Sequence, residues 1–248
     1  IKHTEGIDGL TWANQRLLLA SGEEKSTDDQ GERHGWIRIF DMPSAKEIAT
    51  IDYGSTVNEL FFSSDDRYLL AIGHIGVKIY DTSDWSLQQE LHAPDARILT
   101  SGVFSPDGKY VLVTGRTSTT RGIIYLWEWE SATLLKAFNH LGKKVETVSW
   151  HPNGDYIVYA GHDGNIFTYR VADILKYSND RIPTASRTWA SDHMEYLDFN
   201  ADGSFLVSAH QNGLIKLWVW MGEDPALNAK RHHGIKKQQD KAQEAIKR

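Results

Sequence analysis

The chain has 248 residues, of which 40% are hydrophobic and 24% charged, an ordinary composition for a globular protein. It has no cysteine, which excludes disulfides and thiolate metal sites, and no apolar run approaches the ~20 residues that span a bilayer. The net charge of −6 is uneven: residues 224–248 hold seven Lys or Arg against three Asp or Glu, and residues 1–223 hold 20 against 30. The acidic body argues against a broad nucleic-acid-binding surface, since phosphate contacts need clustered cations; only the basic tail offers such a contact.

The start of the chain carries no methionine and no signal-peptide pattern. Its first residues fall in the middle of a repeat, so we expect a processed, trimmed or partial product. No targeting segment is visible, and the absence of cysteine fits a cytoplasm, a periplasm or the outside of a cell equally well.

One segment recurs five times along the chain. Aligned on an aromatic anchor, the copies are spaced by 40, 47, 42 and 49 residues, with anchors at Phe40, Tyr80, Trp127, Tyr169 and Trp218. A period of about 40–45 residues built from four short strands is typical of a β-propeller. The sequence therefore predicts an all-β fold: a propeller of four-stranded antiparallel blades, five of them in this chain.

The predicted strands follow the same plan in each copy. The first copy has strands at 7–12, 16–20, 36–40 and 47–51, and the second at 57–62, 68–72, 77–80 and 87–91. The third has strands at 98–104, 110–114, 123–127 and 133–138, with a loop over 115–122. The fourth has strands at 145–150, 156–160 and 166–169, and an excursion over 171–186 displaces its outer strand to 187–189. The fifth has strands at 195–199, 205–209 and 214–218 and lacks an outer strand.

A turn separates the first two strands of each copy. In Ser105-Pro106-Asp107-Gly108 the proline fixes φ and the glycine accepts positive φ. The expected domain is a propeller over 1–223, with blades at about 1–52, 53–92, 93–140, 141–189 and 190–223. The basic, polar tail over 224–248 is expected to be helical or disordered.

These features resemble the WD-repeat family over roughly residues 1–220. The family ends its third strand with Trp-Asp, and here those positions read Phe40-Asp41, Tyr80-Asp81, Trp127-Glu128, Tyr169-Arg170 and Trp218-Val219. His3 lies nine residues before Trp12 and Asp163 lies six before Tyr169, the spacings of the family's loop His and turn Asp. In the other copies that turn position holds His34, His74, Arg121 and Asn212, so the family's buried Asp–His–Ser–Trp set is expected to be incomplete.

The resemblance also implies a ring of six to eight blades, most often seven. We therefore expect one to three further blades, either in the parent chain or supplied by a partner; a ring closed by five unusual blades is the alternative. The implied function is a non-catalytic scaffold that binds protein or peptide partners through its loop-rich face. Two alternatives remain open: a propeller enzyme or small-ligand binder using the central channel, and a structural subunit of a larger, multi-subunit assembly.

Candidate contact residues lie in the loops expected on one face, because function concentrates on loops held by a rigid scaffold. An acidic group falls in the loop over 21–35: Glu23, Glu24, Asp28 and Asp29. A basic group falls in loops of adjacent blades and suits an acidic or phosphorylated peptide: Arg116, Arg121, Lys143 and Lys144. Histidines follow the second strand in several copies: His34, His74, His162 and His210. Their separation around a ring argues against a metal, which needs ligands within about 2 Å.

Catalytic motifs are missing from the sequence. It contains no Gly-x-Ser-x-Gly, no phosphate loop and no His-Glu-x-x-His, and no spacing pairs a nucleophile with a base. We predict no enzyme activity, no catalytic residue, no cofactor and no bound metal. The expected structural anchors are His3, Asp163 and the five aromatic residues.

Overall fold

The computed structural model describes residues 3, 5–24, 26–27, 33–74, 76–117, 121–139, 143–176, 186–189 and 192–221. Within these residues the fold is almost entirely β: four four-stranded antiparallel sheets, one three-stranded sheet and one two-stranded ribbon. The all-β prediction is confirmed. The predicted tail over 224–248 lies outside the described residues.

The five sheets follow one another in chain order, and we number them blades 1 to 5. Blade 1 contains β1 (Ile7–Trp12), β2 (Leu18–Glu23), β5 (Trp36–Asp41) and β6 (Lys46–Asp52), and blade 2 contains β7 (Val57–Phe62), β8 (Tyr68–Gly73), β9 (Gly76–Asp81) and β10 (Leu87–Leu91). Blade 3 contains β11 (Ala96–Phe104), β12 (Tyr110–Thr117), β13 (Gly122–Glu128) and β14 (Thr133–Asn139). Blade 4 contains β15 (Val145–Trp150), β16 (Tyr156–Gly161), β17 (Asn165–Arg170) and β18 (Ser186–Trp189). Blade 5 contains β19 (Met194–Phe199), β20 (Phe205–His210) and β21 (Ile215–Val219).

Three predicted loops differ from the structure. The loop predicted over 21–35 begins later, because β2 continues to Glu23, and it carries the ribbon of β3 (Ser26–Thr27) and β4 (Arg33–His34). The loop predicted over 115–122 is shorter, because Arg116 pairs with Gly122 and extends β12 and β13. The excursion after β17 begins with a helix, α1 (Val171–Lys176), whose Val171 and Ile174 are buried against blade 4.

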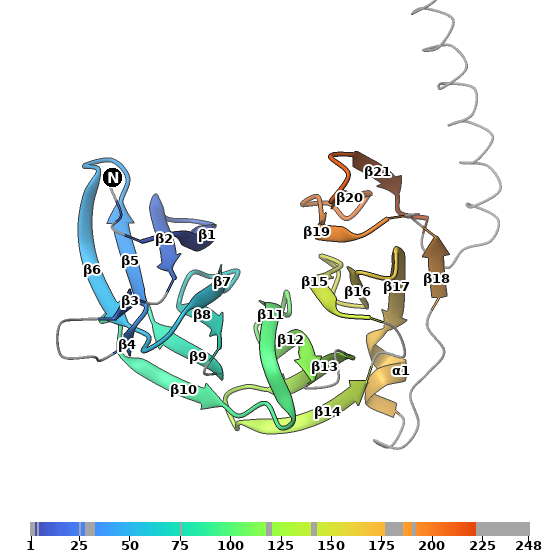
Figure 1. Ribbon diagram of the computed structural model, residues 1–248, viewed down its shortest axis with the longest axis horizontal. Helices are drawn as coiled ribbons and strands as arrows, with labels where there is room; N and C mark the ends of the chain where they lie inside the picture. The colour runs from blue at the N-terminus through green and yellow to red at the C-terminus, as the bar shows by residue number, and fades with distance from the viewer. Residues whose placement is uncertain are drawn as a thin grey trace, which may run out of the picture.

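The blades stand side by side around an arc, with their first strands nearest the centre and their outer strands at the periphery (Figure 1). Four separate hydrophobic clusters each lie between neighbouring blades, from blades 1 and 2 through to blades 4 and 5. Blades 1 and 5 lie on opposite sides of an opening in the arc (Figure 1). Each interior blade is therefore covered on both faces, whereas each end blade is covered by a neighbour on one face.

A turn between strands links blades 1 and 2 at their rim. Asp66 stands where the related turn of blade 3 has Gly108, and both adopt a left-handed backbone, with φ of 58° and 72°. The Asp66 carboxylate accepts backbone N–H groups of Asn14, Gln15 and Arg16 at 2.6, 2.6 and 2.9 Å. Burial alone would raise the pKa of Asp66, but these hydrogen bonds outweigh it and lower the pKa. Asp66, which stands in place of the turn glycine, thus bonds blade 2 to the backbone of blade 1.

Candidate interaction surface

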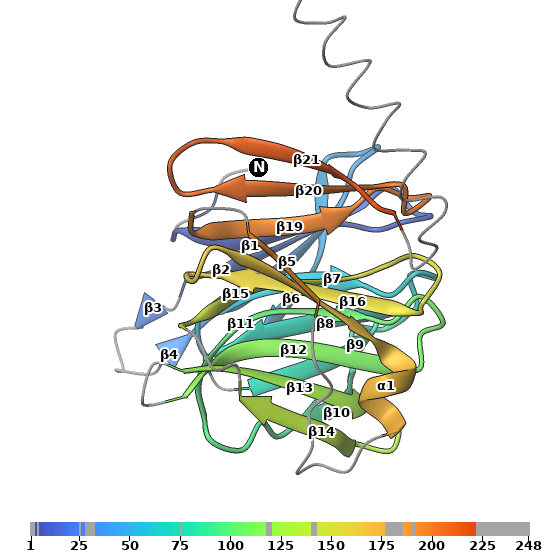
Figure 2. The ribbon, with the colours of Figure 1, turned by 90° about the vertical axis from the view of Figure 1, so that its right-hand side faces the viewer.

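The topology brings those predicted contact residues that the structure describes to one rim of the molecule. In every blade the connection after the second strand and the connection before the first strand emerge at the same end of the sheet. In Figure 2 this rim lies on the left, where β3, β4 and the β20–β21 turn are visible. The opposite rim carries the turns between first and second strands, including those at Asp66 and Gly108.

A pocket of about 270 Å³ opens on this rim between blades 2 and 3. Its floor includes the buried Leu91 and Leu99, and its walls include the exposed His74, His92 and Arg97. This volume is below the range of about 300–1,000 Å³ that is typical of ligand pockets, so it suits one side chain of a partner better than a cofactor.

Hydrogen bonds hold the walls of this pocket in place. The Tyr53 hydroxyl donates to the carbonyl of Gly76 at 2.6 Å, and the Tyr125 hydroxyl donates to the carbonyl of Pro94. Burial raises the pKa of both phenols, so both remain donors at physiological pH. The pocket is therefore built mainly on strands of blades 2 and 3, with His74, His92 and Ala93 in the connections between strands.

Basic side chains lie at the same rim in blades 3 and 4, and one of them, Arg97, lines the pocket. Arg97 lies in a bulge of β11 next to the residue paired with Arg116, and Arg121 lies just before β13. Arg116 is half-buried, whereas Arg97, Arg121 and Lys143 are exposed. Lys144 contacts Glu146 at 2.7 Å, so part of the predicted basic group is already paired. Arg97 and His92 were not predicted as contact residues, although their position just before the first strand of the third copy indicates the same rim.

The predicted acidic group is divided by the fold. Glu24 is exposed after β2, and Asp28 and Asp29 lie outside the described residues. The prediction for Glu23 is wrong: the sequence places it in an exposed loop, but in the structure it ends β2 and is fully buried. Its burial follows from its position in the strand and from its ion pair with Arg38.

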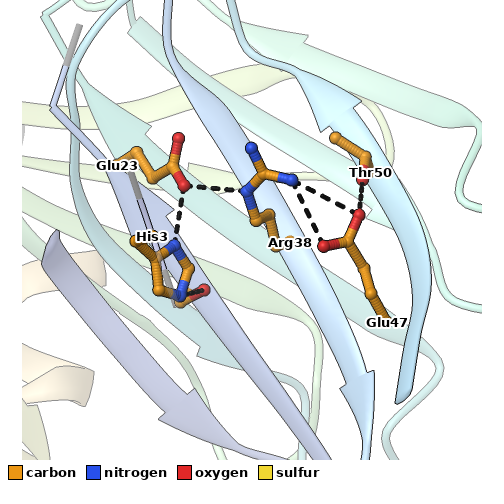
Figure 3. A network of polar contacts seen from close by, with 6 residues as sticks. His3, Glu23, Arg38, Glu47 and Thr50 are labelled. Atoms are coloured by element: carbon orange, nitrogen blue, oxygen red, sulfur yellow. Dashed lines mark hydrogen bonds and ion pairs between the residues drawn. The ribbon is translucent and has the colours of Figure 1, made fainter. Parts of the chain in front are cut away.

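That ion pair belongs to a network on the face of blade 1 that points away from blade 2 (Figure 3). Glu23 Oε1 accepts from His3 Nδ1 at 2.7 Å and from Arg38 Nε at 2.8 Å. Arg38 continues to Glu47 at 3.2 Å, and Thr50 donates to the same carboxylate. The Thr50 hydrogen bond, followed by Arg38, lowers the pKa of Glu47. The network orders blade 1 rather than leaving Glu23 available to a partner.

The rim histidines are held by different partners. His34 Nδ1 contacts Asp52 at 2.7 Å and its ring stacks on Trp36. His162 Nε2 contacts Glu146 Oε1 at 2.5 Å. His210 is buried, where its Nε2 lies 2.9 Å from Ser208 Oγ, and burial lowers its pKa. The prediction that His210 forms part of an exposed contact surface is therefore wrong, because its ring points into the blade 4–5 interface.

The predicted structural anchors lie in the blade interiors. Phe40, Tyr80, Trp127 and Tyr169 are buried, and Trp218 packs on the blade 4–5 cluster. Two fragments of the expected Asp–His–Ser–Trp set are present. In blade 1, His3 contacts Ser21 at 3.3 Å and Glu23 takes the acidic place, and in blade 5, Trp218 donates to Ser208 at 2.8 Å. Asp163 accepts the Asn165 N–H within its turn.

The described residues contain no group of three His, Cys, Asp or Glu side chains arranged to hold a metal ion. Across the same part of the chain, no helix is long and apolar enough to cross a membrane.

The repeated antiparallel sheets around an arc define the class of protein as a β-propeller. Residues 132–169 and 189–219 match the family model described as WD domain, G-beta repeat. These two segments cover less than a third of the chain, and they support the resemblance to WD-repeat proteins that the sequence indicates.

Several curated proteins are similar to most of this chain. It is 22% identical to the serine-threonine kinase receptor-associated protein of Gallus gallus, over 83% of this chain and 52% of that protein. It is 24% identical to the target of rapamycin complex subunit wat1 of Schizosaccharomyces pombe, over 85% and 61%. It is 24% identical to the U3 small nucleolar RNA-associated protein 17 of the same yeast, over 86% and 23%. The chain thus spans about half the length of the first two relatives and less of the third.

Proposed function

We propose that this chain is part of a non-catalytic scaffold that binds a protein partner at the rim pocket between blades 2 and 3. The observation that carries the proposal is the pocket itself, with an apolar floor at Leu91 and Leu99 and charged or polar walls. Such a cavity between rigid blades binds a side chain with little loss of conformational entropy in the protein. Names of the similar proteins, which include a receptor-associated protein and a complex subunit, support the same role.

The charge around the pocket favours a partner segment that places an acidic side chain beside an apolar one. Arg97 forms one wall, and Arg121 and Lys143 extend the basic surface toward blade 4. Arginine pairs with carboxylate in a bidentate geometry, which gives direction as well as attraction. Glu90, from blade 2, also lines the pocket, so the two blades contribute opposite charges, which favours one orientation of the bound segment.

A displayed library of 12-residue peptides, selected against the chain, tests this function. We expect enriched peptides that pair Asp or Glu with a large apolar residue, and we expect Arg97→Glu to weaken their binding at least tenfold. Lys109→Glu is the matched control, because Lys109 is exposed in a turn on the opposite rim and its substitution should leave binding unchanged. Failure to enrich any peptide, or equal effects of the two variants, would contradict the proposal.

A further inference from the structure

Two histidines line the rim pocket between blades 2 and 3. His74 follows β8 in the short connection to β9, and His92 follows β10 in the connection to β11. Both are exposed, and among the side chains of the described residues neither ring makes a hydrogen bond, an ion pair or an aromatic contact. Their ring nitrogens are therefore available to a bound partner.

Other histidines at this rim already have partners. His34 contacts Asp52 at 2.7 Å, and His162 contacts Glu146 at 2.5 Å. The His162 ring also stacks on the ring of His193, with 4.5 Å between the ring centroids. The two pocket histidines differ from these in both position and contacts, which points to a role in binding rather than in holding the blades together.

The permanent charges at the pocket cancel. Arg97 on β11 and Glu90 on β10 line it, one positive and one negative. Asp95 precedes β11 and is exposed outside the lining residues, and Lys78 on β9 donates to the carbonyl of Tyr53 at 3.1 Å. The protonation of the two histidines therefore decides whether the pocket is neutral or carries up to two positive charges.

The chemistry of a protonated imidazole matches an acidic side chain. Histidine changes charge between about pH 5 and 8, and its protonated ring has two N–H donors and no acceptor. The carboxylate of a free Asp or Glu stays ionised over this range, because its pKa is about 4. A carboxylate at the pocket can thus accept hydrogen bonds from imidazolium N–H groups as well as from Arg97.

We infer that His74 and His92 select the acidic side chain of the partner segment and bind it as imidazolium ions, so that binding at the rim pocket takes up protons and strengthens as the pH falls from about 8 to about 5.5. This inference rests on the proposed function and adds to it the residues that recognise the acid and the dependence on pH. Arg97 supplies a charge that is constant over this range, whereas the histidines supply the charge that changes.

The apolar floor of the pocket gives a contribution that the pH leaves unchanged. Leu91 and Leu99 belong to this floor, are buried and carry no titratable group. A segment whose acidic residue is replaced by the matching amide keeps its apolar contact with the floor and loses its attraction to the imidazolium rings. The acidic form and the amide form of one peptide therefore separate the two contributions.

Fluorescence anisotropy with a pair of labelled peptides tests the inference. One is the most enriched 12-residue peptide from the displayed library, and the other carries Asn or Gln in place of each Asp or Glu. We expect the acidic peptide to bind the chain about fivefold more tightly at pH 5.5 than at pH 8, since each exposed ion pair strengthens binding by a small factor. The affinity of the amide peptide should change by less than about twofold.

Substitution of both histidines is the decisive variant. In His74→Gln/His92→Gln the acidic peptide should bind with the affinity that the wild type shows at pH 8, and this affinity should stay nearly constant with pH. His193→Gln is the matched control, because His193 lies at the same rim just before the inner strand of blade 5 and outside the pocket. Its loss should leave the pH effect on peptide binding in place.

The outcomes separate this inference from the proposed function. Binding of the acidic peptide that is constant with pH, or a pH effect that persists in the double variant, would overturn the inference and leave the proposed function standing. Failure of every peptide to bind the wild type at either pH would overturn both. Equal loss of the pH effect in the double variant and in His193→Gln would assign it to the rim as a whole and reject the role of the two pocket histidines.

Discussion

Blades 2 and 5 place the same kinds of residue at matching strand positions, in different surroundings. Ile79 in blade 2 is fully buried between blades 2 and 3, whereas Leu217 at the corresponding position of blade 5 is 68% exposed. Local sequence therefore does not distinguish an interior blade from an end blade, since both retain apolar residues on both faces. The difference shows that burial of these positions depends on the neighbouring blade, so we expect blade stability to depend on it as well, as in other repeat architectures.

Truncation of these two residues gives the largest contrast. In residues 1–248, Ile79→Ala should lower the free energy of unfolding by about 3–4 kcal/mol, because it leaves a cavity in a packed cluster. Leu217→Ala should change it by less than about 0.5 kcal/mol, because the side chain is mostly in solvent. Urea unfolding followed by tryptophan fluorescence measures both. Equal large losses would show that the Leu217 face is already covered in the isolated chain.

An intermediate contrast comes from the residue three positions before the aromatic end of the inner strand, which is Glu59 in blade 2 and Tyr196 in blade 5. Glu59 Oε2 accepts a hydrogen bond from the backbone N–H of Gly102 in blade 3 at 2.7 Å. Burial raises the pKa of Glu59 to about 7, above the value of about 4.3 in an unfolded chain. A raised carboxyl pKa favours folding below the unfolded pKa, and this contribution is lost as the pH rises from about 4.3 to 7. Because the side chain keeps partial contact with solvent, we expect a loss of about 2 kcal/mol.

The measurement is the free energy of unfolding of the wild type and of Glu59→Gln between pH 4 and 8. The variant should show a smaller fall than the wild type over this range, by about 2 kcal/mol, since an amide does not titrate whereas Asp198, whose pKa is also raised by burial, still does. Leu217→Ala is the control from blade 5 and should keep the wild-type pH dependence, because it removes no titratable group and no hydrogen bond. Parallel curves for the wild type and Glu59→Gln would contradict the assignment.

Most strands could be predicted from the sequence because each copy contains its own strand and turn signals. Period-two strands and turns such as Ser105-Pro106-Asp107-Gly108 are local features, so the strand order and most strand bounds could be derived from the sequence. Errors arose where pairing extends a strand beyond its local pattern. Arg116 reads as a loop residue, but its pairing with Gly122 draws it into β12.

The candidate site was harder to predict, because it depends on contacts between copies. In the sequence, Glu23 looks the same as the acidic residues of an exposed loop. Only the structure shows that it is buried, in contact with His3 and Arg38. The pocket joins His74 to Arg97 across two blades, which spacing along the chain does not reveal. The inter-blade hydrogen bonds, by contrast, lie at a fixed offset from an aromatic residue, so they can be sought in sequences of related repeats.

The smallest contrast isolates one inter-blade hydrogen bond from the packing around it. Thr147→Val keeps the shape of a buried side chain but removes the acceptor of the Leu197 N–H. An unsatisfied buried N–H costs about 1 kcal/mol or more, so the free energy of unfolding should fall by about 1 kcal/mol. Tyr196→Phe should change it by less than about 0.5 kcal/mol, since only an exposed contact with Asp198 is lost. Native-state hydrogen exchange adds a direct readout, because the Leu197 amide should exchange faster in Thr147→Val. If that amide keeps its protection, the bond between blades 4 and 5 does not hold the inner strands together, and the junction rests on apolar packing alone.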